Sequence, residues 1–527
     1  MNADAKSPPP RAALFVWFVL LALSVGVAAF AFHIRECFVD DAFIGFQYLR
    51  NLLAGEGFVF YPGAPPVEGV TNIGWLLVLA PLCTIAEPTL VAKLAGLALV
   101  LLTLILTVRL GQGLAAKVAT AEDSFGLVLF PVLMLVASFD FIYFSLAGME
   151  TALLAAILVL MTCMALCRPH SMLLPVLGAF AFLVHPEAVA VYPLYAALCW
   201  LQTKRGATNG HGATNGRDFV VGTLILAGLV GGATAVRLAY FHDVVPNTFH
   251  SKPSDLELAV HNGYAFLMGQ NTNVAFPITG WLALPVLLLG YRRLRRAAPA
   301  AADMLAAICG AGLVLAVYSP PDWTLLPRYF APYLPAALIL LWAGLGEAIQ
   351  LLLRTTRPKL QHFIAVPAAI VLLLTGIFDG KTRMAQMEEF PGYVLAGKNL
   401  VGPAVWMRDH LPEEATIATR RIGILAYHSH RKVFDYTYGL PEPEVARLVA
   451  RRGLRFDAPT DPALATLWRA RAPDYLLEDG AIIDSIVSQT GGVRGRFSIH
   501  GIEYRVVQQF PIGHEVQWVL AQRIGTE

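Results

Sequence analysis

Two adjacent carboxylates, Asp40 and Asp41, follow directly after the first long apolar segment of the chain. A third acid, Glu68, lies in the same Gly- and Pro-rich stretch, which ends at Asn72. Acids beside a membrane segment are costly unless they are solvated, paired or needed for chemistry. A carboxylate within hydrogen-bond reach of a hydroxyl can take its proton while the hydroxyl attacks a substrate. These acids are therefore our first candidates for a catalytic site; the alternative is a solvated loop with ordinary surface acids.

Two further ionisable sites lie next to or within apolar sequence. Glu150 opens an apolar segment, where an acid can also act simply as a favourable charge at a helix N-terminus. His185 and Glu187 flank Pro186 inside apolar sequence. Such a pair indicates either a functional group or a kink in which the two side chains satisfy each other.

Basic and amide groups cluster after another apolar segment and are suited to holding a phosphate. Arg237 precedes the polar stretch with Asn247, Thr248 and Lys252, and Arg328 stands before a later apolar segment. Arginine offers a bidentate fork to phosphate, and lysine a point charge. The alternatives are an ordinary turn at 246–252 and an interfacial arginine at 328.

Several functional classes have no support in the sequence. It contains no Walker loop, no Gly-rich dinucleotide turn after a strand, no HExxH and no Gly-x-Ser-x-Gly elbow, so no nucleotide site is indicated. The net charge of +2 and the lack of a basic stripe predict no nucleic-acid partner. We predict no metal site, because no ligand set can be counted, although a divalent cation could join the acids.

The composition places these groups in an integral membrane protein. Of 527 residues, 56% are hydrophobic and only 14% are charged, against about 25% in soluble domains. The apolar run 12–32, behind Lys6 and Arg11, predicts a retained first membrane helix with a cytoplasmic N-terminus. Further apolar segments lie near 73–86, 90–108, 125–139, 150–167, 172–184, 186–201, 219–240, 275–290, 303–318, 329–352 and 362–378.

The basic loops between these segments predict about 11 transmembrane helices and a C-terminus on the outer side. The segment 73–86 is too short for a comfortable span and is our candidate for a partial or re-entrant helix; the broken pair 172–201 is the other uncertain place.

From about residue 382 the sequence becomes polar, and no later run is long enough to span. Alternating runs predict strands at 504–507 and 516–520, and capped amphipathic runs predict helices at 442–451 and 462–470. We therefore expect a transmembrane domain at 1–381, with its first loop at 33–72, and a soluble α/β or α+β domain at 382–527.

The order of these motifs resembles the GT-C class of membrane glycosyltransferases, nearest the terminal arabinofuranosyltransferase branch of actinobacterial cell walls. The likeness rests mainly on the first loop: Asp40-Asp41-Ala42-Phe43-Ile44, Arg50-Asn51, Gly55-x-Gly57, Pro62-Gly63, Val67-Glu68-Gly69, Thr71-Asn72 and Trp75. Weaker elements are Gly148–Thr151, His185–Glu187, Pro246–Lys252 and Arg328-Tyr329, with Gly423, Tyr427, Arg431, Asp435 and Gly439-Leu440 in the polar part.

The resemblance implies an inverting enzyme of the bacterial inner membrane, with the C-terminal domain in the periplasm. Such an enzyme moves a sugar from a polyprenyl-phosphate carrier to a hydroxyl of a cell-envelope glycan or glycoconjugate. The nearest likeness implies arabinofuranose, and a hexose is the alternative. The resemblance makes Asp40 the base and Asp41 an orienting group. The carrier phosphate would bind Arg237, Asn247, Thr248, Lys252 and Arg328. The acceptor or its pocket would be lined by Glu68, Asn72, Glu150, His185, Glu187 and Tyr427.

Two other functions have to be weighed. A transporter or flippase of a lipid-linked or small polar substrate would also contain intramembrane ionisable groups and broken helices. Inverted repeats would favour it, and none is visible. A non-catalytic anchored sensor would not need so many spans.

Overall fold

The computed structural model describes residues 10–118, 121–204, 216–252, 256–268, 280–319, 328–353, 366–367, 370–378, 380–382, 396–453, 456–493, 495–512 and 516–525. The chain divides into two compact units. The helical unit comprises residues 1–35, 90–233 and 255–384. The composite unit comprises residues 36–89, 234–254 and 385–527, so three separate stretches of sequence build it.

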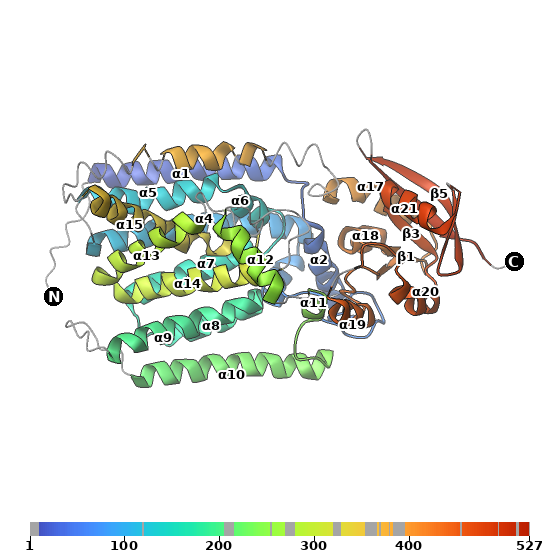
Figure 1. Cartoon of the computed structure of the whole chain (residues 1–527), viewed down its shortest axis with the longest axis horizontal. Coiled ribbons are helices and arrows are strands. Elements are labelled where there is room, and N and C mark those ends of the chain that lie inside the picture. The colour runs from blue at the N-terminus through green and yellow to red at the C-terminus, as the bar shows by residue number, and fades with distance from the viewer. Residues whose placement is uncertain are drawn as a thin grey trace. The chain divides into compact units, whose positions relative to one another are not determined.

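The helical unit is a bundle of apolar helices, several of which run alongside one another in Figure 1. Its elements are α1 (Pro10–His33), α4 (Pro88–Val118), α5 (Ala121–Ala137), α6 (Phe139–Leu146), α7 (Thr151–Cys167), α8 (Leu173–Val184), η1 (Pro186–Ala190), α9 (Val191–Lys204), α10 (Gly216–Phe241), α12 (Leu256–Leu267), α13 (Gly280–Ala297), α14 (Pro299–Tyr318), η2 (Ala331–Tyr333) and α15 (Leu334–Leu353). Helices suit such apolar sequence because they satisfy their own backbone hydrogen bonds where no water is available.

Glycines allow close packing between α13 and α15. A Cβ on Gly290 would lie 1.9 Å from the carbonyl oxygen of Leu340, and one on Gly344 would lie 1.8 Å from that of Val286. Small residues at such crossings let two helix backbones approach each other, as is usual inside membranes.

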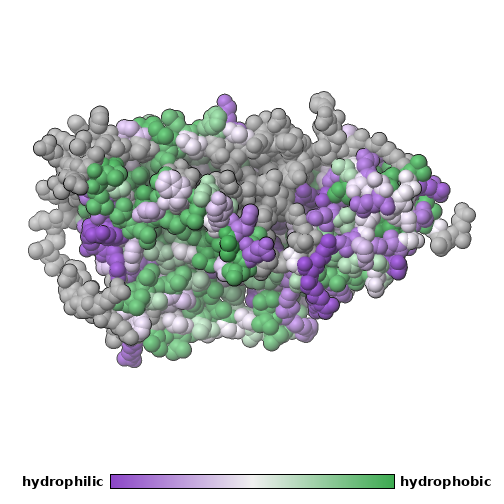
Figure 2. All heavy atoms as spheres, in the orientation of Figure 1, coloured by the Kyte–Doolittle hydropathy of each residue, from purple (hydrophilic) through white to green (hydrophobic). Residues whose placement is uncertain are grey.

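Five helices in the described part of the chain are long and apolar enough to cross a membrane, or six if the bent pair Gly126–Ala137 and Phe139–Leu146 forms one span. Figure 2 shows apolar side chains over much of the coloured surface of the helical unit. The polytopic helical class is thus confirmed, while the count of eleven spans stays a prediction. The short segment α3 (Ile73–Cys83) has 11 residues, fewer than the about 20 that a span needs.

The composite unit contains a mixed six-stranded sheet in the order β2-β1-β3-β6-β5-β4. The strands are β1 (Thr416–Thr419), β2 (Lys432–Asp435), β3 (Tyr475–Asp479), β4 (Arg496–Ile499), β5 (Ile502–Ile512) and β6 (Val516–Arg523). The pairs β1–β2 and β1–β3 are parallel, and the remaining pairs are antiparallel.

The rest of the composite unit is helical. Its helices lie in the sheet domain (residues 396–525), in the first stretch (36–89) and in the segment 234–254. They are α2 (Asp40–Leu53), α3, α11 (Asn247–His250), α17 (Ala396–His410), α18 (Ile422–Ser429), α19 (Pro443–Arg452), η3 (Pro462–Leu464), α20 (Ala465–Arg471) and α21 (Gly480–Thr490). Val449 of α19, Trp468 of α20 and Ile486 of α21 pack with Tyr504 and Val519 of the sheet in one buried core.

The expected C-terminal α/β or α+β fold is confirmed, as are the strands at 504–507 and 516–520 and the helices at 442–451 and 462–470. The compact units divide the chain differently from the expected linear boundary at residue 382, because 36–89 and 234–254 group with the C-terminal part.

Candidate functional site

The first acid of the pair, Asp40, binds the N-terminus of a helix that is remote in sequence. Its Oδ1 accepts a hydrogen bond from Ile424 N at 2.8 Å, and its Oδ2 accepts one from Gly423 N at 3.3 Å. Helix α18 has no side-chain cap of its own at Arg421. Asp40 therefore satisfies amide groups at the start of α18 that an N-cap side chain would ordinarily bind.

The two helices meet at backbone distance. A Cβ on Gly423 would lie 2.1 Å from the carbonyl oxygen of Asp40 and 3.0 Å from Ile44 N. Aromatic contacts extend the interface, since the ring of Phe43 lies 5.3 Å from that of Tyr427 and 5.1 Å from that of His428. Only glycine fits at 423 because any side chain there would have to displace backbone atoms.

Burial distinguishes the two aspartates. Asp40 is 4% exposed, whereas Asp41 is partly exposed at the first turn of α2. Burial raises the pKa of Asp40 to about 6; the Ile424 N–H and Arg421 oppose this shift, and Asp41 adds to it. A carboxylate with a pKa near 6 is ionised at neutral pH and is more basic than an ordinary aspartate.

Glu68 and Arg237 form a buried ion pair. Arg237 Nε donates to Glu68 Oε2 at 2.5 Å and Nη2 donates to Oε1 at 3.1 Å. The side chains are only 1% and 7% exposed. This bidentate geometry ties the first loop to the end of α10, whose residues from 234 onward belong to the composite unit. It engages two groups that the sequence assigned separately to the acceptor and the phosphate.

The 246–252 segment is held on a turn of the sheet domain. Asn247 Nδ2 donates to the carbonyl oxygens of Gly439 and Leu440, each at 2.7 Å. The hydroxyl of Thr248 is buried and has no hydrogen-bond partner among the described residues. Lys252 follows α11 and is partly exposed. The amide of Asn247 is thus engaged in positioning, and the phosphate-binding role of Thr248 and Lys252 stays a prediction.

Tyr427 and Asn72 occupy structural positions in the same unit. Arg50 donates from Nη1 to the carbonyl oxygen of Tyr427 at 2.8 Å, and its Cζ lies 5.0 Å from the centre of the Tyr427 ring. Asn72 is buried and precedes α3, where its carbonyl oxygen accepts a hydrogen bond from Trp75 N at 2.9 Å.

The other predicted site residues belong to the helical unit. Glu150 is buried at the start of α7, and its carbonyl oxygen accepts from Leu154 N. His185 Nδ1 lies 2.7 Å from Glu187 Oε2 at the break between α8 and η1. The Cζ of Arg328 lies 5.5 Å from the Tyr329 ring centre. The role of these residues in the site around Asp40 stays a prediction.

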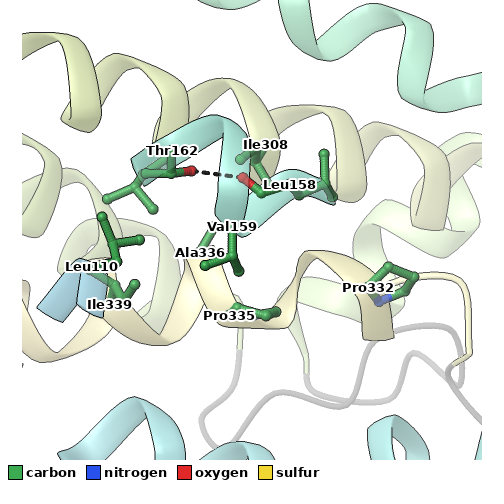
Figure 3. Close-up of a pocket in the computed structure, with 10 residues that line it drawn as sticks. Leu110, Leu158, Val159, Thr162, Ile308, Pro332, Pro335, Ala336 and Ile339 are labelled. Atoms are coloured by element: carbon green, nitrogen blue, oxygen red, sulfur yellow. Dashed lines mark hydrogen bonds between the residues drawn. The ribbon is translucent and has the colours of Figure 1, made fainter. Parts of the chain in front are cut away.

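The part of the chain that the structure describes holds no clear metal site, and one of its gaps is almost wholly apolar. No group of three or more His, Cys, Asp or Glu side chains is arranged there to hold a metal ion. A small gap among α4, α7, α14 and α15, drawn in Figure 3, is lined almost entirely by aliphatic side chains. The hydroxyl of its polar residue, Thr162, is already bound to Leu158 O at 3.0 Å.

The sequence assigned no role to the amide and hydroxyl groups that shape the first loop. Gln47 Nε2 donates to Phe60 O at 2.8 Å, and Asn51 Nδ2 donates to the carbonyls of Val59 and Phe60 at 2.9 Å each. The hydroxyl of Tyr61 contacts the sheet domain. The helical spacing of Gln47 and Asn51, at i and i+4, was the available signal.

Comparisons with known proteins agree with this architecture. Two solved structures of ArnT from Cupriavidus metallidurans share the fold: the apo form has a TM-score of 0.54 at 13% identity, and the form bound to undecaprenyl phosphate has 0.53 at 14%. Each alignment covers 97% of this chain and 98% of the other. The protein therefore has a GT-C fold.

The sequence comparisons are less informative. Residues 393–524 match the family described as "Domain of unknown function (DUF8728)". No curated protein matches the sequence.

Proposed function

We propose that this protein is a GT-C glycosyltransferase that moves a sugar from a polyprenyl-phosphate carrier to a hydroxyl acceptor at the outer face of a bacterial inner membrane. The observation that carries the proposal is the Asp40–Asp41 pair at the start of α2, in a chain whose fold matches ArnT over nearly its whole length. That ArnT structure is bound to undecaprenyl phosphate, which supports a lipid-phosphate donor here.

The chemistry needs one base and no general acid. The acceptor hydroxyl must lose its proton as the new C–O bond forms, and the lipid phosphate leaves already as an anion. The resemblance makes Asp40 the base that accepts this proton. The partial exposure of Asp41 supports Asp41 as the base instead. The two N–H bonds that Asp40 accepts support a positioning role for Asp40.

The carrier phosphate requires positive charge and hydrogen-bond donors. Lys252 and the unpartnered hydroxyl of Thr248 are our choice within the composite unit, with Arg328 as a further ligand. The bidentate bond of Arg237 to Glu68 supports an indirect role, in which Arg237 fixes the first loop. A pentofuranose is the proposed sugar.

The test is transfer from a panel of polyprenyl-phosphate sugars by the purified, reconstituted protein. We expect one donor to release free polyprenyl phosphate, and Asp41→Asn to lower kcat about 10²- to 10⁴-fold while the protein still folds. Asp40→Asn is the matched control for the division of roles. A larger loss of kcat in Asp40→Asn than in Asp41→Asn would show that Asp40 is the base. Substrate movement without cleavage would favour a flippase.

A further inference from the structure

The Tyr61 hydroxyl of the first loop contacts two oxygen atoms of the sheet domain, one of them from the carboxyl group of Glu442. If Glu442 is ionised, one proton is missing for the two hydrogen bonds. The hydroxyl oxygen of Tyr61 lies 2.5 Å from the carbonyl oxygen of Val433 and 3.0 Å from Oε1 of Glu442. A phenol has one proton to donate, and a backbone carbonyl has none. If Tyr61 donates to Val433, the bond to Glu442 exists only if Glu442 donates in return.

The neighbouring carboxylate explains why the proton belongs on Glu442. Asp435 accepts three backbone N–H bonds: Oδ1 from Thr437 and Tyr438, each at 3.0 Å, and Oδ2 from Leu440 at 2.9 Å. Such bonds favour an ionised carboxylate. Glu442 Oε2 accepts only a longer bond, from Asp435 N at 3.3 Å. Burial raises the pKa of both acids, and two neighbouring buried acids do not ionise together easily. Asp435 accepts more N–H bonds than Glu442, so Asp435 keeps the charge.

We propose that Glu442 is a neutral carboxylic acid at neutral pH and donates a hydrogen bond to the Tyr61 hydroxyl, which fastens the first loop to the sheet domain. Gln47 and Asn51 of α2 hold the backbone immediately before Tyr61. The proton on Glu442 thereby positions α2, which begins with Asp40 and Asp41. The inference does not depend on the proposed transfer reaction.

The groups around Glu442 act in both directions, and burial has the largest effect. Burial raises the pKa of Glu442 well above its usual value and the charge of Asp435 adds to this, while the hydrogen bonds with Tyr61 and with Asp435 N and the charge of Arg471 of α20 oppose it. Tyr48 of α2 is also within electrostatic range. On its own helix, Glu444 pairs with Arg471 at 3.4 Å.

The helix packed against α19 contributes one titratable side chain. His250 of α11 lies 3.2 Å from Asp243 Oδ2 and is thus already engaged by another acid.

The raised pKa of Glu442 sets the direction of the pH dependence of this contact. The folded state holds this proton more tightly than the unfolded chain, so the contact is complete at low and neutral pH and is lost as the pH rises through the raised value. Raising the pH should therefore loosen the first loop, whereas acidification to neutral pH should restore it.

The experiment uses the full-length protein in detergent and three variants. Glu442→Gln keeps a neutral donor in the same shape, Glu442→Ala removes it, and Tyr61→Phe removes its partner. At pH 7 we expect Glu442→Gln to unfold at nearly the wild-type temperature and the other two to unfold about 2–4 °C lower, as for the loss of one hydrogen bond. Above neutral pH only the wild type should lose this contribution.

Infrared difference spectra identify the proton directly. Subtracting the Glu442→Gln spectrum from that of the wild type at pH 7 should leave the carbonyl band of a protonated carboxylic acid, and Tyr61→Phe should shift that band. A carboxylate band in its place, or a Glu442→Gln variant as unstable as Glu442→Ala, would overturn the proposal.

Discussion

The two units bury their charged groups in different ways. In the helical unit, Asp303 accepts from the Tyr291 hydroxyl 12 positions away and from the Cys199 thiol 104 positions away, and His185 meets Glu187 across a single proline. In the composite unit, Asp40 binds amides 383 and 384 positions away. The composite unit therefore depends on contacts that form only when distant stretches of chain have folded together.

The difference bears on which buried acids are candidates for a functional site. A local pair such as His185 and Glu187 can satisfy itself without the rest of the protein, so its presence is compatible with a kink alone. The composite unit instead brings together several buried acids, among them Asp40, Glu68 and Glu442. Holding such groups is costly for folding, which is typical of regions that serve a function.

The ion pair between Glu68 and Arg237 should show the largest effect on stability. Glu68→Gln leaves a buried guanidinium without its counter-charge and should cost about 3–5 kcal/mol of unfolding free energy. Denaturant unfolding in detergent measures this. The matched control is Glu444→Gln, which breaks a half-exposed pair with Arg471 and should cost about 0–1 kcal/mol. If the two variants lost the same unfolding free energy, burial would not make the Glu68–Arg237 pair more important than the exposed pair.

The pH dependence of Asp40 should show a smaller effect. Its folded-state pKa of about 6 exceeds the usual 3.8, so its contribution favours folding below pH 4 and is lost as the pH rises through 6. The loss amounts to about 3 kcal/mol. Unfolding curves between pH 4 and 8 should therefore fall more steeply for the wild type than for Asp40→Asn. Parallel curves would show that burial does not perturb this carboxyl.

The backbone contact at Gly423 should give the smallest of the three effects. Gly423→Ala forces a Cβ against the Asp40 carbonyl and should cost about 1–3 kcal/mol. Gly310→Ala in α14 is the control, because a Cβ there meets nothing within 4 Å. It should be neutral or stabilise by about 0.5–1 kcal/mol. Thermal unfolding of both variants tests whether the α2–α18 contact is as close as described.

Most of the helices and strands could be predicted from local residue patterns. Apolar runs predicted the membrane helices because lipid leaves the backbone few alternatives to helix. Alternation predicted the strands that became β5 and β6, and amphipathic spacing predicted α19 and α20. The acid pair at the start of α2 was visible because carboxylates are unusual beside membrane sequence.

The partners of these acids could not be predicted in this way, because they lie far away along the chain. The residue types did not predict that Asp40 would bind the start of α18. They also did not predict the ion pair between Arg237 and Glu68, or the position of Tyr61 between Val433 and Glu442. Composition and periodicity report local preferences over one or two turns of helix or a few residues of strand. A hydrogen bond between groups hundreds of positions apart depends instead on how whole elements pack, and that packing sets both the burial and the charge state of each acid.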